Sequence, residues 1–163
     1  MGPQMALYDS THTNLVSSWN LGKIKAQEAT EVLEVNLWNN KGGSSDVSDL
    51  KEAYITVLDS EGDTANDDVA RDGWIQVNEP SVDGDQDTFT PIGGALTKDI
   101  KANSALILDY TISGAANDGE PGNDSDGSGC TKNFATLRFR AVAPPNSNPG
   151  EKTFKIRLSG YFT

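Results

Sequence analysis

The sequence contains one cysteine, Cys130, and one histidine, His12, among its 163 residues. A single cysteine cannot form an internal disulfide, and a single histidine cannot form a two-histidine metal site. Cys130 stands in a Gly/Asp-rich stretch, which favours a solvent-near free thiol over a nucleophile. The common residue sets for nucleophilic catalysis are therefore not indicated, and we expect a protein that is not an enzyme.

Long apolar runs are also missing. No stretch approaches the roughly 20 residues needed to cross a bilayer, and no basic segment followed by an apolar one marks a secretory signal. We therefore expect synthesis in a cytoplasm and no membrane partner. Residues 1–4, Met-Gly-Pro-Gln, have the composition of a cloning remnant before a natural start at Met5, with a native start at Met1 as the alternative. Residues 5–163 then fit a single domain.

Positive charge is scarce, and the formal net charge is −11. Nucleic acid is therefore not an expected partner, because it requires a basic surface. The charge is also unevenly distributed. Residues 59–87 are strongly acidic, with Arg71 as their one base, and residues 134–163 are basic, with Glu151 as their one acid. This division predicts an acidic end and a basic patch, which would suit contacts between copies of the chain.

The clearest strand patterns lie near the C-terminus. Apolar and polar residues alternate over Phe134–Val142 and again over Thr153–Phe162, as in half-buried strands. Between them, residues 143–150 contain three prolines, which end both strands. We predict an antiparallel hairpin with an apolar inner face and a basic outer face. Its basic residues are candidate interface residues: Arg138, Arg140, Lys155 and Arg157.

Similar patterns predict the rest of the sheet structure. A second pair of strands is expected at Glu31–Trp38 and Ala53–Leu58, with an Asn/Gly turn after Trp38. Weaker strands are expected in four further segments: Leu15–Ile24, Trp74–Asn78, Thr88–Ile92 and Ala105–Ile112. Seven or eight such strands predict an all-β, antiparallel β-sandwich, immunoglobulin-like or jelly-roll in outline, with a closed barrel as the alternative. Residues 59–72 and 113–133 should form long exposed acidic loops.

Calcium is the one cofactor that the sequence suggests. Asp83, Asp85 and Asp87 alternate along one loop, and Asp124 and Asp126 lie in a second acidic loop. Carboxylates at such spacing can turn towards one hard cation. The first loop lacks the glycine and the later glutamate of an EF-hand, and solvated acidic loops are common. The favoured interpretation is that the protein has no cofactor.

The tryptophans give a second candidate site. Trp38 and Trp74 alternate with the aliphatic residues of their strands, so they should lie on the opposite face, where at least one could be exposed. Exposed aromatic rings can stack on sugars, which makes carbohydrate an alternative partner. Aromatic residues are also enriched in cores and at subunit interfaces. We therefore favour a core or interface position for Trp38 and Trp74.

Short segments of the sequence resemble parts of two groups of known proteins. Residues 37–42 (Leu-Trp-Asn-Asn-Lys-Gly), with 47–50 and 55–57, resemble the strand–turn–strand of accessory immunoglobulin-like domains, as do residues 144–156 near the C-terminus. Residues 37–42, 89–94 (Phe-Thr-Pro-Ile-Gly-Gly) and 161–163 (Tyr-Phe-Thr) also resemble small structural proteins of bacteriophages and prophages. The second resemblance implies a virion component of the capsid, neck, tail or baseplate that has no enzymatic activity.

These observations leave two hypotheses open. In the first, the chain is a structural or decoration protein, assembled in the bacterial cytoplasm, that contacts itself and other virion proteins. Charge reversal at two of its basic candidates should then weaken assembly without unfolding the domain. In the second, the chain is a carbohydrate-binding or adhesive module, with or without calcium.

Overall fold

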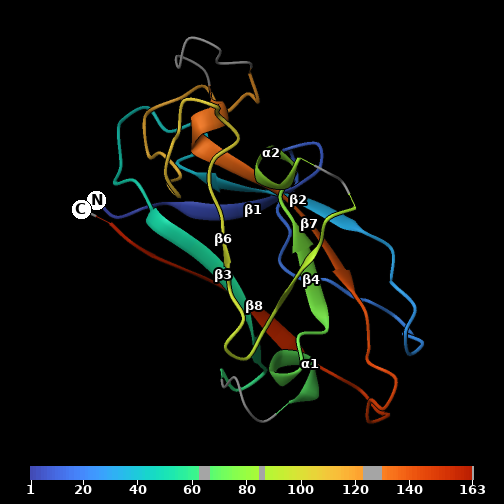
Figure 1. The fold of residues 1–163 in the computed structure, drawn as a ribbon. Helices are drawn as coiled ribbons and strands as arrows, with labels where there is room; N and C mark the ends of the chain where they lie inside the picture. The colour runs from blue at the N-terminus through green and yellow to red at the C-terminus, as the bar shows by residue number, and fades with distance from the viewer. Residues whose placement is uncertain (63–66, 85–86, 123–129, 163) are drawn as a thin grey trace.

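The computed structural model describes residues 1–62, 67–84, 87–122 and 130–162. Eight strands form two antiparallel sheets, one of five strands and one of three (Figure 1). The predicted all-β, antiparallel β-sandwich is therefore confirmed. Of the helices described, none is long and apolar enough to span a membrane.

The five-stranded sheet has the order β1-β2-β7-β4-β5. Its strands are β1 (Met5–Asp9), β2 (Leu33–Asn39), β7 (Phe134–Ala141), β4 (Ile75–Asn78) and β5 (Thr90–Ile92). The three-stranded sheet has the order β6-β3-β8. Its strands are β6 (Lys98–Asp99), β3 (Lys51–Asp59) and β8 (Phe154–Tyr161). Three short helical turns complete the described elements: α1 (Asp68–Arg71), α2 (Pro80–Asp83) and a 3₁₀ turn (Thr131–Asn133).

The core lies between the two sheets. In β3, the inward residues Ala53, Ile55 and Val57 are at most 1% exposed. In β7, Leu137 and Phe139 are 1% and 2% exposed and belong to the same cluster. The period-2 alternation of the sequence therefore identifies the inner face of both strands correctly, because successive side chains in a strand point to opposite faces.

The strand pairing differs from the predicted hairpins. β7 pairs with β2 and β4, whereas β8 pairs with β3 in the other sheet. The proline-containing connection after β7 crosses from one sheet to the other (Figure 1). The same correction applies to the segments Glu31–Trp38 and Ala53–Leu58, which also lie in different sheets. Alternation shows which face of a strand is buried, but it does not show which strand lies beside it.

Two predicted strands are absent from the described structure. Leu15–Ile24 makes one isolated bridge, Leu15 to Tyr8, and then covers the core as an irregular segment. Ala105–Ile112 makes one bridge, Ile112 to Leu50. The loop expected at residues 59–72 also contains α1, whose Val69 is buried.

The two termini lie side by side (Figure 1). Residues 1–4, interpreted above as a cloning remnant, make main-chain contacts with the domain. Ser48 donates from its backbone N and from its Oγ to the Met1 carbonyl, each at 3.0 Å. The Asn40 N–H donates to the Gln4 carbonyl at 2.9 Å. The segment therefore packs as part of the folded domain.

Candidate functional site

Arg138 and Arg140 lie on the outer face of the five-stranded sheet, because the apolar residues of β7 take the inner positions. The Nε of Arg140 donates to Gln76 Oε1 at 2.8 Å, and its guanidinium carbon lies 4.0 Å from the centre of the Phe89 ring. The Nε of Arg138 lies 3.9 Å from a carboxylate oxygen of Glu34. The two arginines form an ordered cationic strip on this face.

Lys155 and Arg157 lie on β8, and both are exposed. The inner faces of the two sheets pack against each other, so β7 and β8 present their outward residues on opposite sides of the sandwich. The four basic candidates therefore do not form one patch, and the prediction of a single basic face is wrong. The molecule instead has two basic surfaces, one on each sheet.

Trp38 and Trp74 are both buried, with exposed fractions of 0% and 5%. Trp38 does lie on the outer face of β2, as predicted, but that face is covered. Its ring stacks on Phe134 with the ring centres 4.6 Å apart, and its Nε1–H donates to His12 Nδ1 at 3.0 Å. Together with Cys130, these residues form a second, smaller core outside the sheet. The core position favoured for both tryptophans is therefore observed, and the alternative, in which at least one of them is exposed to a sugar or to a partner, is wrong.

Cys130 is 5% exposed, so the predicted solvent-near position of its thiol is also wrong. Its Sγ donates to Asp118 Oδ1 at 3.0 Å. Burial, together with the adjacent Asp118 carboxylate, raises the pKa of the Cys130 thiol. A thiol held in its protonated form is a weak nucleophile, which makes packing the better account of this cysteine.

In the first candidate calcium loop, the carboxylate of Asp83 is already bound by other groups of the chain. Its Oδ2 accepts from the backbone N–H of Glu79 at 2.7 Å, and its Oδ1 lies 3.0 Å from the Lys98 ammonium. Lys98 thus takes the place at this carboxylate that a cation would need. Asp85, Asp124 and Asp126 lie outside the described residues. Among the residues that the structure describes, which include Asp87, no three His, Cys, Asp or Glu side chains are grouped so as to hold a metal ion.

Glu79 is a buried carboxyl group that the sequence patterns did not indicate. Its side chain is 0% exposed, Oε1 accepts from the Lys101 backbone N–H at 3.0 Å, and Oε2 has no hydrogen-bond partner. Burial raises the pKa of Glu79 to about 8, although the Lys101 N–H and the Lys98 charge act in the opposite direction. The group is therefore mostly protonated at neutral pH. Nothing in the local sequence distinguishes this glutamate from its solvated neighbours.

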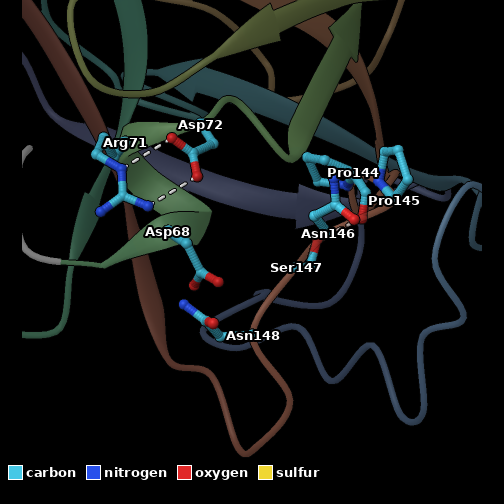
Figure 2. A pocket seen from close by; sticks show the side chains of 8 residues that line it. All are labelled: Asp68, Arg71, Asp72, Pro144, Pro145, Asn146, Ser147 and Asn148. Carbon is cyan, nitrogen blue, oxygen red and sulfur yellow. Dashed lines mark hydrogen bonds and ion pairs between the residues drawn. The ribbon is translucent and has the colours of Figure 1, made fainter.

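A hollow of about 360 Å³ lies between α1 and residues 144–148 (Figure 2). The Asp68 carboxylate points into it near Asn148, but its Oδ1 is 2.9 Å from the Lys152 ammonium. Arg71 is bound to Asp72 through two contacts of 2.8 and 2.9 Å. The charged groups of this hollow are thus each paired, Asp68 with Lys152 and Arg71 with Asp72, which favours a structural role.

A second hollow, of about 380 Å³, is formed by residues 19–23 and 30–33. Trp19 forms one wall, and its ring is held edge-on by Phe154, with the ring centres 5.9 Å apart. Asn20, Lys23 and Glu31 supply polar groups around it. Trp19 is the one half-buried tryptophan of the three, so it is the tryptophan that a ligand could reach.

Exposed apolar residues gather on the segment that was expected to be a strand at Ala105–Ile112. Leu106, Leu108 and Tyr110 are 54%, 91% and 44% exposed. The Tyr110 carbonyl accepts from Ala53 N at 2.9 Å, which ties the end of the segment to β3. We call Leu106, Leu108 and Tyr110 the 106–110 patch. The apolar run over residues 105–108 was visible in the sequence, but its exposure was not.

The chain was compared with known proteins at the level of sequence. No protein-family model matches it, and no curated protein matches it either. The surfaces and cavities described above are therefore the structural basis for a functional proposal.

Proposed function

We propose that the protein is a non-enzymatic structural or decoration component of a phage-like virion that acts through contacts with its own copies and with other virion proteins. The observation that carries this proposal is the 106–110 patch. The short sequence resemblance to phage structural proteins supplies the virion context, and the patch supplies the means of assembly.

The energetics of the 106–110 patch favour a protein contact. Leu108 is 91% exposed, with Leu106 and Tyr110 two residues to either side. Covering one leucine side chain contributes about 1.5–3 kcal/mol, so a partner that covers all three residues gains a substantial free energy. Groups of exposed apolar residues on the surface of a small domain commonly mark such contacts. We therefore assign the patch to self-association.

Replacing Leu108 by Asp should abolish self-association without unfolding the domain, because the side chain makes little contact within the chain. Leu15→Asp is a matched control, since Leu15 is 69% exposed and does not belong to the patch. Sedimentation velocity should show oligomers for the wild type and for Leu15→Asp, and monomers for Leu108→Asp. Equal sedimentation of all three proteins would contradict the assignment of the patch.

A specific observation also supports carbohydrate binding as a second candidate function. The hollow beside Trp19 combines an aromatic wall with amide, ammonium and carboxylate groups. Aromatic residues bind sugars through the apolar face of the ring, and the polar groups orient the hydroxyls. The opposite charges of Lys23 and Glu31 favour a neutral polysaccharide over an anionic one.

Under this second candidate, a neutral polysaccharide should change the fluorescence of Trp19 alone, because Trp38 and Trp74 are buried. Calorimetry should show affinity reduced by about tenfold or more in Trp19→Ala, equivalent to about 1.4 kcal/mol. Leu15→Ala, an exposed site outside the hollow, should bind as the wild type does. If no neutral polysaccharide changes the fluorescence or releases heat, this candidate fails.

A further inference from the structure

β8 is an eight-residue strand at the edge of the three-stranded sheet. It pairs along its length with β3 on one side. On its other side, residues 154–161 make no backbone hydrogen bond with any described part of the chain. Edge strands present a row of outward N–H and C=O groups, which can pair with another extended chain. The second edge of β8 is therefore open.

The apolar side of β8 is also incompletely covered. Ile156 and Leu158 remain partly accessible, whereas Val57 and Ile55, their partners in register on β3, are 0% and 1% exposed. Phe154 is likewise half-buried. The core thus thins towards the open edge. A further strand beside β8 would cover these three side chains and extend the same hydrophobic core.

The charge of β8 is opposite to that of the whole molecule. The full sequence has a net charge of −11. Lys155 and Arg157 are exposed on the outer face of the strand, and neither has an ion-pair partner among the described residues. Basic residues on edge strands hinder pairing between identical strands, because like charges would face each other. The same residues favour a partner strand that carries acidic side chains.

We propose that the open edge of β8 binds an extended acidic segment of a partner protein, which adds to the three-stranded sheet as a fourth strand. This inference rests on the proposed function in assembly and names a second contact for it. The partner segment alternates apolar and acidic residues. Its apolar side chains cover Phe154, Ile156 and Leu158, and its carboxylates lie near Lys155 and Arg157. Main-chain hydrogen bonds supply the affinity, as in other cases of strand addition.

The direct probe is a capped peptide in which Val and Glu alternate over the length of β8. NMR titration should show that it binds and that outward-facing amides of residues 154–161 become protected from hydrogen exchange. The double variant Lys155→Glu/Arg157→Glu should bind this peptide at least tenfold more weakly and should instead bind the matching Val/Lys peptide. Thermal unfolding of the variant serves as the control for its folding.

N-methylation of the peptide separates strand pairing from simple charge attraction. Methyl groups on alternate residues block one edge of the peptide, so one of the two methylation patterns should abolish binding and the other should preserve it. Equal binding of both methylated peptides would overturn the proposal, since it would mean attraction by charge alone. Absence of binding by the Val/Glu peptide would also overturn it. Either result is distinguishable from failure of the proposed function, which is measured separately through the 106–110 patch.

Discussion

We expect the wild-type protein to lose stability between pH 6.5 and pH 8, and replacing Glu79 by Gln should remove that loss. A carboxyl whose pKa is 4.5 in the unfolded chain and about 8 in the folded protein binds its proton more tightly when folded. Its contribution to stability is therefore complete below pH 4.5 and is lost as the pH rises to 8. The slope is about 1.4 kcal/mol for each pH unit, so the loss between pH 6.5 and pH 8 is about 2 kcal/mol.

The groups around Glu79 explain why its pKa is raised in the folded protein. Asp83 raises the pKa of Glu79, while the charges of Lys98 and Lys101 and the hydrogen bond from the Lys101 N–H lower it without outweighing burial. A glutamine keeps an acceptor for the Lys101 N–H and carries no charge at any pH. Urea unfolding of both proteins at several pH values would measure the effect. A wild-type slope that persists in Glu79→Gln would show that another group is responsible.

The range from pH 6.5 to pH 8 lies above the pH at which His12 contributes an opposite change in stability. Burial, aided by the Lys41 charge, lowers the pKa of His12, so its contribution to stability is complete above 6.5 and is lost as the pH falls below that value. The His12 Nδ1 accepts the Trp38 N–H, which requires the neutral ring. Between pH 6.5 and pH 8 the effect of Glu79 on stability can therefore be measured apart from that of His12.

Replacing Trp38 by Ala should lower the free energy of unfolding by about 3–5 kcal/mol, as expected for a large aromatic removed from a core. The ring is fully buried, stacks on Phe134 and donates its only hydrogen bond to His12. The midpoint of urea unfolding is the appropriate measurement, with Leu15→Ala as an exposed control expected to change stability by no more than about 0.5 kcal/mol. A similarly small cost for Trp38→Ala would mean that the second core does not form.

The sequence predicted strands and their buried faces much better than it predicted their partners. Alternation located β2, β3, β7 and β8, because a buried face requires apolar residues at every second position. Pairing depends on which strands meet across the sandwich, and that is decided by the packing of the whole chain. For this reason β7 and β8, which follow each other in sequence, lie in different sheets.

The candidate site was predicted in part. The basic residues and the tryptophans were recognised as unusual features, but whether a second layer covers a given sheet face is a tertiary property. Trp38 lies on the outer face of its strand and is buried there by His12 and Phe134, whereas Leu108 ends a continuous apolar run and remains exposed. Glu79 is the extreme case, since only its position in the fold distinguishes it from the surrounding solvated acids.

The most direct test of the assembly proposal is the solution mass of the wild-type protein, measured by light scattering after gel filtration, first with calcium and then with a chelator. We expect a defined oligomer whose mass and thermal stability do not change when calcium is removed, because contacts at the 106–110 patch are apolar. A monomer at every concentration that loses thermal stability on chelation would contradict this account and would favour a calcium-dependent binding module.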